Sequence, residues 1–337
     1  MLAYTIRRIV SGALLLVVMS VVTFVLFYAS TDKPERYACG LKCTDQQLEL
    51  TRKSLGYDQP FVEQWGKFAK GFVVGRDFPD NEKLREAAPE QVTHCGTFCL
   101  GLSYTYGDTV NKLLKDKLPV SISLALAAYV LWIVGGVLLG ITAALFKGKL
   151  LDRAIVGLSL VAFAFPTFFI GLLFLKFVAI KWGLVEVPSY TPITENPWAW
   201  ATGMILPAIT LALVYMAGYI RMTRAFVLET LSEDYIRTAR AKGLTKRKVI
   251  GKHTLRAVLT PLVTLSGLDL AGLLGGTVIT EKVFNFNGVG KMSVDAIQRH
   301  DLALVVGIVL LVAAIVIIAN IVVDLLYAVI DPRVRLG

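Results

Sequence analysis

The chain has 337 residues, of which 55% are hydrophobic and 18% are charged, and its mean hydropathy is +0.63. A soluble domain of this length cannot bury so much apolar surface, so composition excludes a soluble globular protein and indicates a membrane protein. The formal net charge of +10 raises nucleic-acid binding as an alternative, but the basic excess is concentrated in short connections between apolar stretches. That distribution favours membrane topology and attraction to anionic lipid.

Apolar residues cluster in six stretches, each near or above the roughly 20 residues that cross a bilayer core. The stretches lie at 9–30, 118–146, 154–180, 203–220, 258–280 and 302–330. The first follows Arg7 and Arg8, as a cleavable signal would, but it is longer than the roughly 7–15 residues of a signal peptide's apolar region. We therefore expect an uncleaved first span and an all-α polytopic membrane protein with six transmembrane helices.

Charge sets the predicted orientation of these spans. Residues 32–117 hold thirteen basic and thirteen acidic side chains, whereas residues 221–256 hold ten against three and the turn 147–153 holds three against one. By the positive-inside rule, the basic connections and both termini face the cytoplasm and residues 31–117 lie outside. The predicted domains are the N-terminus with the first span (1–30), an extracytoplasmic domain (31–117), a core with the basic connection 221–256 (118–330), and a cytoplasmic C-terminus (331–337).

The predicted extracytoplasmic domain contains two amphipathic helical stretches. Gln46–Gly56 follows Asp45 as the expected N-cap and ends at a glycine. Its leucines are the residues expected to be buried: Leu48, Leu55 and, less firmly placed, Leu50. Phe61–Phe72 carries aromatic residues at helical spacing, which indicates packing against a neighbour or the membrane surface rather than a ligand site.

Four cysteines fall in two pairs of the same spacing, Cys39 with Cys43 and Cys95 with Cys99. An even number in an oxidising compartment predicts two disulfides, and the sequence leaves three connectivities open. A tetrathiolate zinc site is the alternative that this spacing permits, but external thiols are chemically exposed, so we favour disulfides and expect no metal. We interpret His94, beside Cys95, as a surface histidine.

Few polar groups lie within the predicted spans. Asp269 falls in the fifth span, Asn320 and Asp324 fall in the sixth, and Lys176 is near the external end of the third. A charge in the middle of a bilayer costs about 2.5–3.5 kcal/mol on insertion scales, so each should face protein or water. The acidic residues do not form a chain adequate for a proton relay.

Glycine and proline interrupt the second to fifth spans. Gly136 and Gly140 form a small-residue pair of the kind that lets helices approach closely in a bilayer. Pro166, Pro207 and Pro261 predict kinks, which are tolerated where neighbouring helices or a cavity satisfy the freed backbone groups. A translocation pathway and ordinary packing irregularity are the two explanations.

The basic connection contains a short helix with signals at both ends. Ser232 is the expected N-cap, acidic residues follow it, basic residues occupy the last turn, and Gly243 closes it. Thr245 is the expected cap of a second helix that runs to Arg256 at the mouth of the fifth span. A capped helix across the end of a bundle offers a surface on which another protein can push.

Residues 235–244 resemble the coupling-helix motif of ABC importer permeases in its peptide/nickel variant, with Arg237-Thr238-Ala239-x3-Gly243 in place of Glu-Ala-Ala-x3-Gly. The resemblance implies contact with an ATPase by Tyr235, Arg237, Thr238, Ala239, Arg240, Ala241, Lys242, Gly243 and Leu244. Other stretches agree: 7–8, 55–60, 118–119, 165–168, 206–208, 288–290 and 331–333. The similarity covers about 1–75 and 104–337; residues 76–103 look like an insertion, and Asn287 stands where a proline often precedes the glycine.

The resemblance implies the type I fold of ABC importer permeases and a multi-pass protein in the inner (plasma) membrane of a bacterium. It also implies a second homologous permease, two cytoplasmic ATPases that bind ATP and Mg²⁺, an external substrate-binding protein, and a di- or oligopeptide substrate. The chain has no Gly-x4-Gly-Lys-Ser/Thr loop, so we expect no cofactor in it and no catalysis by it alone. The alternatives are a nickel-chelate or other small-solute permease, an ion-coupled secondary transporter, and a membrane-anchored receptor subunit.

Overall fold

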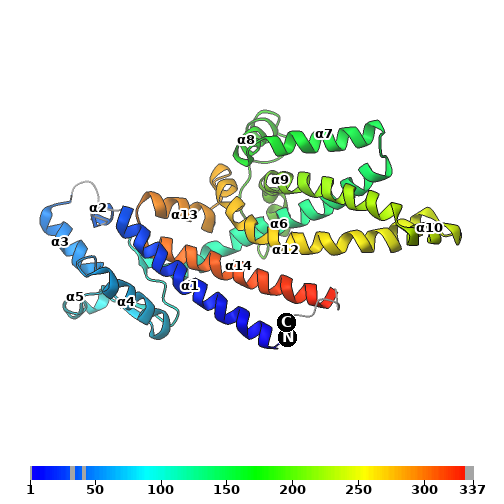
Figure 1. Cartoon of the computed structure of the whole chain (residues 1–337). Helices are drawn as coiled ribbons and strands as arrows, with labels where there is room; N and C mark the ends of the chain where they lie inside the picture. Colours follow the sequence, from blue (N-terminus) through cyan, green and yellow to red (C-terminus); the bar gives the residue numbers. More distant parts are fainter. Residues whose placement is uncertain (1, 31–34, 40–42, 331–337) are drawn as a thin grey trace. The chain divides into compact units, whose positions relative to one another are not determined.

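The structure, a computed structural model, describes the backbone of residues 2–30, 35–39 and 43–330. The predicted cytoplasmic C-terminus, 331–337, lies outside these residues. In the described part the chain is mostly helical, with a few very short strands (Figure 1). The predicted all-α polytopic membrane fold is confirmed.

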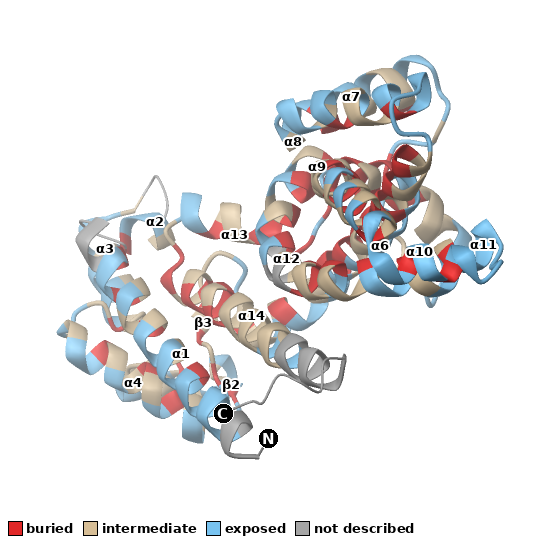
Figure 2. Cartoon of the chain, turned by 45° about the vertical axis from the view of Figure 1, so that its right-hand side comes forward, coloured by how far each residue is buried: buried red, intermediate tan, exposed pale blue. Residues whose placement is uncertain are grey.

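The chain divides into two compact units. The first unit holds Met1–Pro119 and Lys291–Ile317, and the second unit holds Val120–Gly290 and Ile318–Gly337. Two of the long helices therefore contribute to both units. Each unit has its own buried residues, coloured red in Figure 2.

Four helices of the described residues are long and apolar enough to cross a membrane. They are α1 (Leu2–Ser30), α6 (Val110–Leu145), α9 (Pro197–Ser232) and α14 (Leu302–Ile330). A fifth span is present if α7 (Leu150–Ala164) and the bent continuation Thr167–Lys181 count as one. The predicted fifth stretch, 258–280, is helical and lies in α12 (Leu255–Val283). Three side chains of this helix are not among the described residues, so its ability to cross a membrane is not tested. The count of six spans therefore stays a prediction.

The third predicted span is not one straight helix. Helix α7 ends at Ala164, Phe165 and Pro166 are extended, and α8 (Thr167–Leu173) leads into the π-helical η2 (Phe174–Lys181). Proline has no backbone N–H and disfavours helical backbone in the residue before it, so the helix breaks here. The chain bends by 105°, which confirms the predicted kink.

In the first unit, short elements lie between the first two spans. They are α2 (Glu35–Cys39), α3 (Asp45–Ser54), α4 (Phe61–Val74), β1 (Arg76–Phe78), α5 (Glu82–Ala87), η1 (Pro89–Gln91), β2 (Thr93–Cys95), β3 (Leu102–Ser103) and β4 (Asp108–Thr109). Strand β1 pairs antiparallel with β2, and β3 pairs antiparallel with β4. Phe68 of α4 is buried with Phe24 of α1 and Val306 of α14, so the aromatic stripe is core, as predicted.

The start of α3 differs from the prediction. The N-cap is Thr44, whose hydroxyl accepts from the Gln47 backbone N–H at 3.3 Å, while the Gln47 side chain accepts from the Thr44 N–H at 3.1 Å. This reciprocal capping box places Asp45 inside the first turn. Leu50 is exposed, and Leu48 and Leu55 are only half-buried, so the predicted burial of this face was wrong for Leu50.

Both predicted disulfides are present, and each joins two cysteines that are four positions apart in the sequence. Cys39 bonds to Cys43 and Cys95 bonds to Cys99. Cys95 and Cys99 are buried, whereas His94 is exposed and its Nδ1 lies 2.7 Å from Asp77 Oδ1 on the paired strand. His94 therefore lies at the surface, as interpreted from the sequence, with a carboxylate partner.

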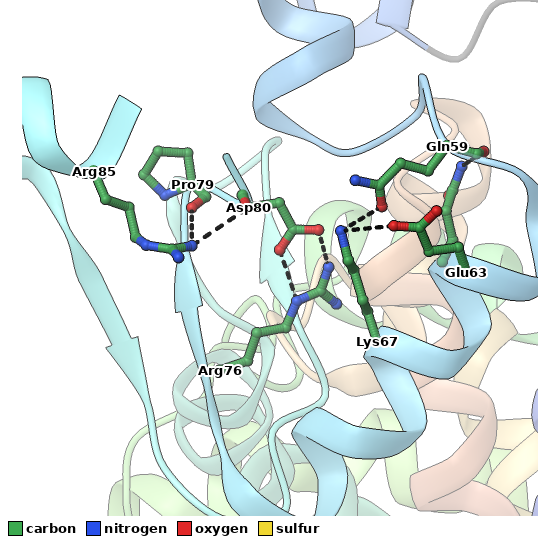
Figure 3. Close-up of polar contacts among 8 residues, drawn as sticks. Gln59, Glu63, Lys67, Arg76, Pro79, Asp80 and Arg85 are labelled. Carbon is green, nitrogen blue, oxygen red and sulfur yellow. Dashed lines mark hydrogen bonds and ion pairs between the residues drawn. The ribbon is translucent and has the colours of Figure 1, made fainter. Parts of the chain in front are cut away.

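Polar contacts order residues 76–85, at the start of the predicted insertion, and the neighbouring helix α4 (Figure 3). Arg76 forms a two-pronged ion pair with Asp80, with Nε to Oδ1 at 2.8 Å. Arg85 donates to the Pro79 carbonyl at 2.9 Å, and Lys67 of α4 donates to Gln59 at 2.6 Å. Residues 76–85 thus have an ordered structure, and the assignment of 76–103 as an insertion stays a prediction.

The start of α14 is fixed by Asp301, which is fully buried. Its carboxylate accepts from the Ser103 hydroxyl at 2.6 Å and, as a helix cap, from the Leu304 backbone N–H at 3.2 Å. The Tyr104 hydroxyl donates to the Arg299 carbonyl. Burial, together with the nearby Asp301 charge, raises the pKa of Tyr104 well above its ordinary value.

Candidate functional site

Helix α10 (Asp234–Ala241) lies directly after α9 and is anchored by one face. Ile236 and Ala239 are buried in a small apolar cluster with Val249 of η3 (Val249–Thr254), and Leu231 of α9 packs against it. Ile236 is 0% exposed. Because the buried positions are three residues apart, the opposite face of α10 is free of this packing.

The predicted caps of this region are partly wrong. Helix α9 continues to Ser232, whose hydroxyl donates to the Glu229 carbonyl at 2.6 Å, so Glu233 takes the N-cap position of α10 instead. Gly243 has φ +77°, a conformation that favours glycine, and follows the end of the helix as predicted. Thr245 precedes the short α11 (Lys246–Lys248) but makes no side-chain cap, and the chain continues through η3 into α12 without ending at Arg256.

The outward face of α10 gathers most of the predicted coupling residues. All except Ala239 are exposed: Tyr235, Arg237, Thr238, Arg240, Ala241, Lys242, Gly243 and Leu244. Figure 2 shows this exposure along α10 and α11. We call Tyr235, Arg237, Arg240, Lys242 and Leu244 the α10 surface; it combines a large, 47% exposed tyrosine with three cations. Ala239 is a packing residue, which the motif alone did not reveal.

Midway along the long helices of the second unit lies a group of aromatic rings around one carboxylate. We call Tyr129 and Trp132 of α6, Tyr215 and Tyr219 of α9, and Asp269 of α12 the aromatic–carboxylate cluster. Trp132 stacks on Tyr215 with ring centroids 4.6 Å apart, and the Tyr219 hydroxyl donates to Asp269 Oδ2 at 2.6 Å. Asp269 faces protein, as expected for an intramembrane acid.

The other predicted polar positions are less informative. Asn320 is half-buried in α14, and the side chain of Asp324 lies outside the described residues, so a hydrogen bond between them stays a prediction. Lys176 is exposed in η2.

Sequence reasoning missed Glu281, a fully buried acid near the end of α12. The Ser121 hydroxyl donates to Glu281 Oε1 at 2.6 Å and accepts from the Val289 backbone N–H at 2.9 Å. A methyl group on Gly288 would lie 2.5 Å from Glu281 Oε2. Residues 288 and 290 are glycines because the Glu281 carboxylate occupies the space that a side chain would need. In the sequence, an acidic residue seven positions before this Gly-Val-Gly stretch was the signal that could have indicated the contact.

A second missed feature is an ion pair between α7 and α9. Arg224 donates to both carboxylate oxygens of Asp152, at 2.7 and 2.8 Å, and the Gly148 backbone N–H donates to the same carboxylate at 2.8 Å. In the sequence these residues counted only toward the charge of the connections. Their pairing depends on the long-range packing of α7 on α9, which no local pattern revealed.

The glycine pair in α6 packs within this chain. A methyl group on Gly136 would lie 2.6 Å from Tyr219 Cβ, and one on Gly140 would lie 2.5 Å from Thr223 Cβ. The two glycines thus allow α6 and α9 to approach closely, which is the role such pairs have in membranes.

Comparison with known proteins assigns the class. The family described as "Binding-protein-dependent transport system inner membrane component" matches residues 136–336, and the N-terminal family of the same membrane components matches residues 1–125. The chain belongs to this family of inner-membrane components, the permeases of ABC importers. The alternatives of an ion-coupled carrier and a receptor anchor are thereby set aside.

Relatives of similar length support this assignment. A probable peptide ABC transporter permease protein of Sinorhizobium fredii is 32% identical over 98% of this chain and 99% of its own length. A putative peptide transport system permease protein of Brucella abortus and the glutathione transport system permease protein GsiC of Escherichia coli are each 31% identical over 99% of both chains. The inward-facing MetNI methionine ABC transporter, 17% identical, covers 65% of this chain and 96% of that chain with a TM-score of 0.52, which supports the fold.

Proposed function

We propose that this chain forms half of the translocation pathway of a bacterial inner-membrane importer for di- or oligopeptides. A second homologous permease forms the other half, two cytoplasmic ATPase subunits bind ATP and Mg²⁺, and an external binding protein delivers the peptide. The peptide assignment is supported by relatives named for peptide and glutathione transport. Both termini and α10 face the cytoplasm in this proposal, and the 31–117 segment faces outward, in agreement with the distribution of basic residues.

The observation that carries the mechanism is the two-faced character of α10. One face is anchored on η3 and α9 through Ile236 and Ala239, and the other presents the α10 surface to solvent. Since η3 continues directly into α12, a force applied to α10 reaches a long helix that carries Asp269. We propose that α10 is the coupling helix and that ATPase closure is transmitted to the bundle through it.

Charge complementarity suggests what the partner presents. Residues 237–248 contain six basic side chains and no acidic one, and most of this segment is exposed. An acidic, partly apolar groove on the ATPase would pair with Arg237, Arg240 and Lys242 while receiving Tyr235. The contact then both orients and pushes the helix.

The test measures ATP-driven peptide uptake by the complete importer in proteoliposomes. Arg240→Glu and Gly243→Pro are expected to reduce uptake strongly at normal protein level, because the first reverses a surface charge and the second places proline at φ +77°. Lys147→Glu, a charge reversal in another basic turn, is the matched control. Undiminished uptake in both α10 variants would show that α10 does not couple the ATPase.

The partners are tested by gentle detergent purification of the chain from its native membrane, followed by mass spectrometry. Recovery of an ATPase and a second permease is expected. Repeated recovery of the chain alone would contradict the proposed assembly.

A further inference from the structure

The aromatic–carboxylate cluster lies at equivalent depths of three helices. Asp269 is at the midpoint of α12, and Tyr129, Trp132, Tyr215 and Tyr219 all fall in the middle third of α6 or α9. An ionisable residue within the membrane is costly, and it therefore points to a functional site.

The cluster retains unused polar groups. Asp269 accepts a hydrogen bond through Oδ2 from Tyr219, but in the described part of the chain its Oδ1 has no partner and no cation pairs with it. The Tyr215 hydroxyl likewise has no hydrogen bond among the described residues. The indole N–H of Trp132, 0% exposed, is buried without an acceptor. Asp269 Oδ1 and the Tyr215 oxygen can therefore accept hydrogen bonds from a ligand, whereas the Trp132 N–H, which only donates, cannot bind a cationic group.

One side of this cluster is open. Asp269 is half-exposed, and Gly272 and Gly276 follow it at one and two turns along the same face of α12. The nearest atom to a methyl group on Gly272 would be the Tyr215 hydroxyl oxygen at 3.7 Å, and a methyl group on Gly275 would meet no atom within 4 Å. The Tyr215 hydroxyl thus has no tightly packed neighbour at Gly272, whereas one turn further a methyl group on Gly276 would lie 2.9 Å from Leu211 Cδ1.

We propose that Asp269 and Tyr215 bind the α-ammonium group of the peptide substrate midway through the membrane. An ammonium group has three donors and no acceptor; Asp269 Oδ1 and the Tyr215 oxygen supply two acceptors. The stacked Trp132 and Tyr215 rings add aromatic faces, which attract cations. No basic side chain belongs to the cluster, so the peptide's carboxylate is disfavoured here and the site selects its amino end.

This inference rests on the proposed peptide function, and the test separates the two. Uptake of trialanine and of N-acetyl-trialanine is measured with the complete importer in proteoliposomes, for the wild type and for Asp269→Asn. Asparagine keeps the size of the side chain and an acceptor for Tyr219 but removes the charge. Expressing each variant relative to wild type for the same peptide cancels any preference of the binding protein.

Asp269→Asn is expected to reduce uptake of trialanine about tenfold or more, because a hydrogen-bonded charge partner is lost, and to leave residual N-acetyl-trialanine uptake unchanged. Asp269→Glu should restore part of the loss. Thr264→Val, in the same helix and with its hydroxyl donating to the Thr260 carbonyl, is the control. Equal loss for both peptides, or no loss, would overturn the ammonium site while leaving peptide import standing; absence of uptake of any peptide by wild type would overturn both.

A second measurement does not depend on acetylated substrate. A tripeptide with a photoreactive diazirine on its N-terminal residue is trapped in the importer during ATP hydrolysis and cross-linked. We expect label within 129–132, 215–219 or 266–272, and its loss in Asp269→Asn. Labelling of these segments by a C-terminal diazirine, with the N-terminal probe elsewhere, would refute the assigned orientation.

Discussion

The anchoring of α10 through Ile236 leads to a quantitative prediction. The side chain is fully buried in the small cluster with Ala239 and Val249, and it is the larger of the two buried side chains of this eight-residue helix. A helix this short is not stable alone in water, so its structure depends on that packing. Truncating Ile236 to alanine should cost about 2–5 kcal/mol, whereas truncation to valine should cost about 0.5–1.5 kcal/mol.

If the truncation destabilises only the state in which α10 is packed on η3 and α9, a cost of about 2 kcal/mol raises the population of the undocked state about 30-fold. Trypsin cleavage at Arg237 or Arg240 of the full chain in lipid nanodiscs measures this population, because proteolysis under mild conditions tracks the open form. Ile236→Ala should be cleaved about 30-fold faster or more and should support little ATP-driven uptake in the complete importer.

Two matched variants define the controls. Ile236→Val should be cleaved only about 2- to 13-fold faster than wild type and should retain most of the uptake. Thr238→Ala, on the exposed face, should change cleavage little. If Ile236→Ala is cleaved and transports like Ile236→Val, the apolar cluster does not hold α10, and the mechanical role given to its buried face is refuted.

Three further predictions concern packing and cross-links. Glu281→Ala should lower the thermal unfolding midpoint in detergent by an amount equivalent to about 1–3 kcal/mol, whereas Glu281→Gln, which keeps an acceptor, should lower it less; equal midpoints would contradict the buried network. Gly140→Leu should reduce folded yield sharply, whereas Gly157→Leu should not, because a methyl group on Gly157 meets no atom within 4 Å; size-exclusion profiles of both variants decide. Replacing Cys95 and Cys99 together by serine should cost at most about 2 kcal/mol because the closed loop is short, and maleimide labelling of the wild type without reductant would disprove the bond.

Much of the fold could be predicted because apolar length and charge bias are local properties of the sequence. The break at Pro166 and the turn at Gly243 followed from the backbone chemistry of single residues. The caps were less predictable because Ser232 and Asp45 are both good N-cap residues beside the true caps, and tertiary packing decides how far the preceding helix extends.

The candidate site was predictable only where a motif is continuous. The predicted coupling residues are adjacent in sequence, so their location on and directly after one short helix could be expected. Glu281 and the Asp152–Arg224 pair depend on contacts between distant segments, and the hydrogen-bond donor to Asp269, Tyr219, lies on a different helix 50 residues away. Local patterns hold no information about such pairs.

The close contact of α6 and α9 has a consequence for movement during transport. With glycine against Tyr219 and Thr223, the two helices have little freedom to separate or slide, and we expect them to move as one rigid body. Alternating access would then shift α12, driven from η3, against this pair. The hydrogen bond from Tyr219 to Asp269 joins α9 to α12. If α12 shifts against the α6–α9 pair, this bond would break and re-form once in each transport cycle.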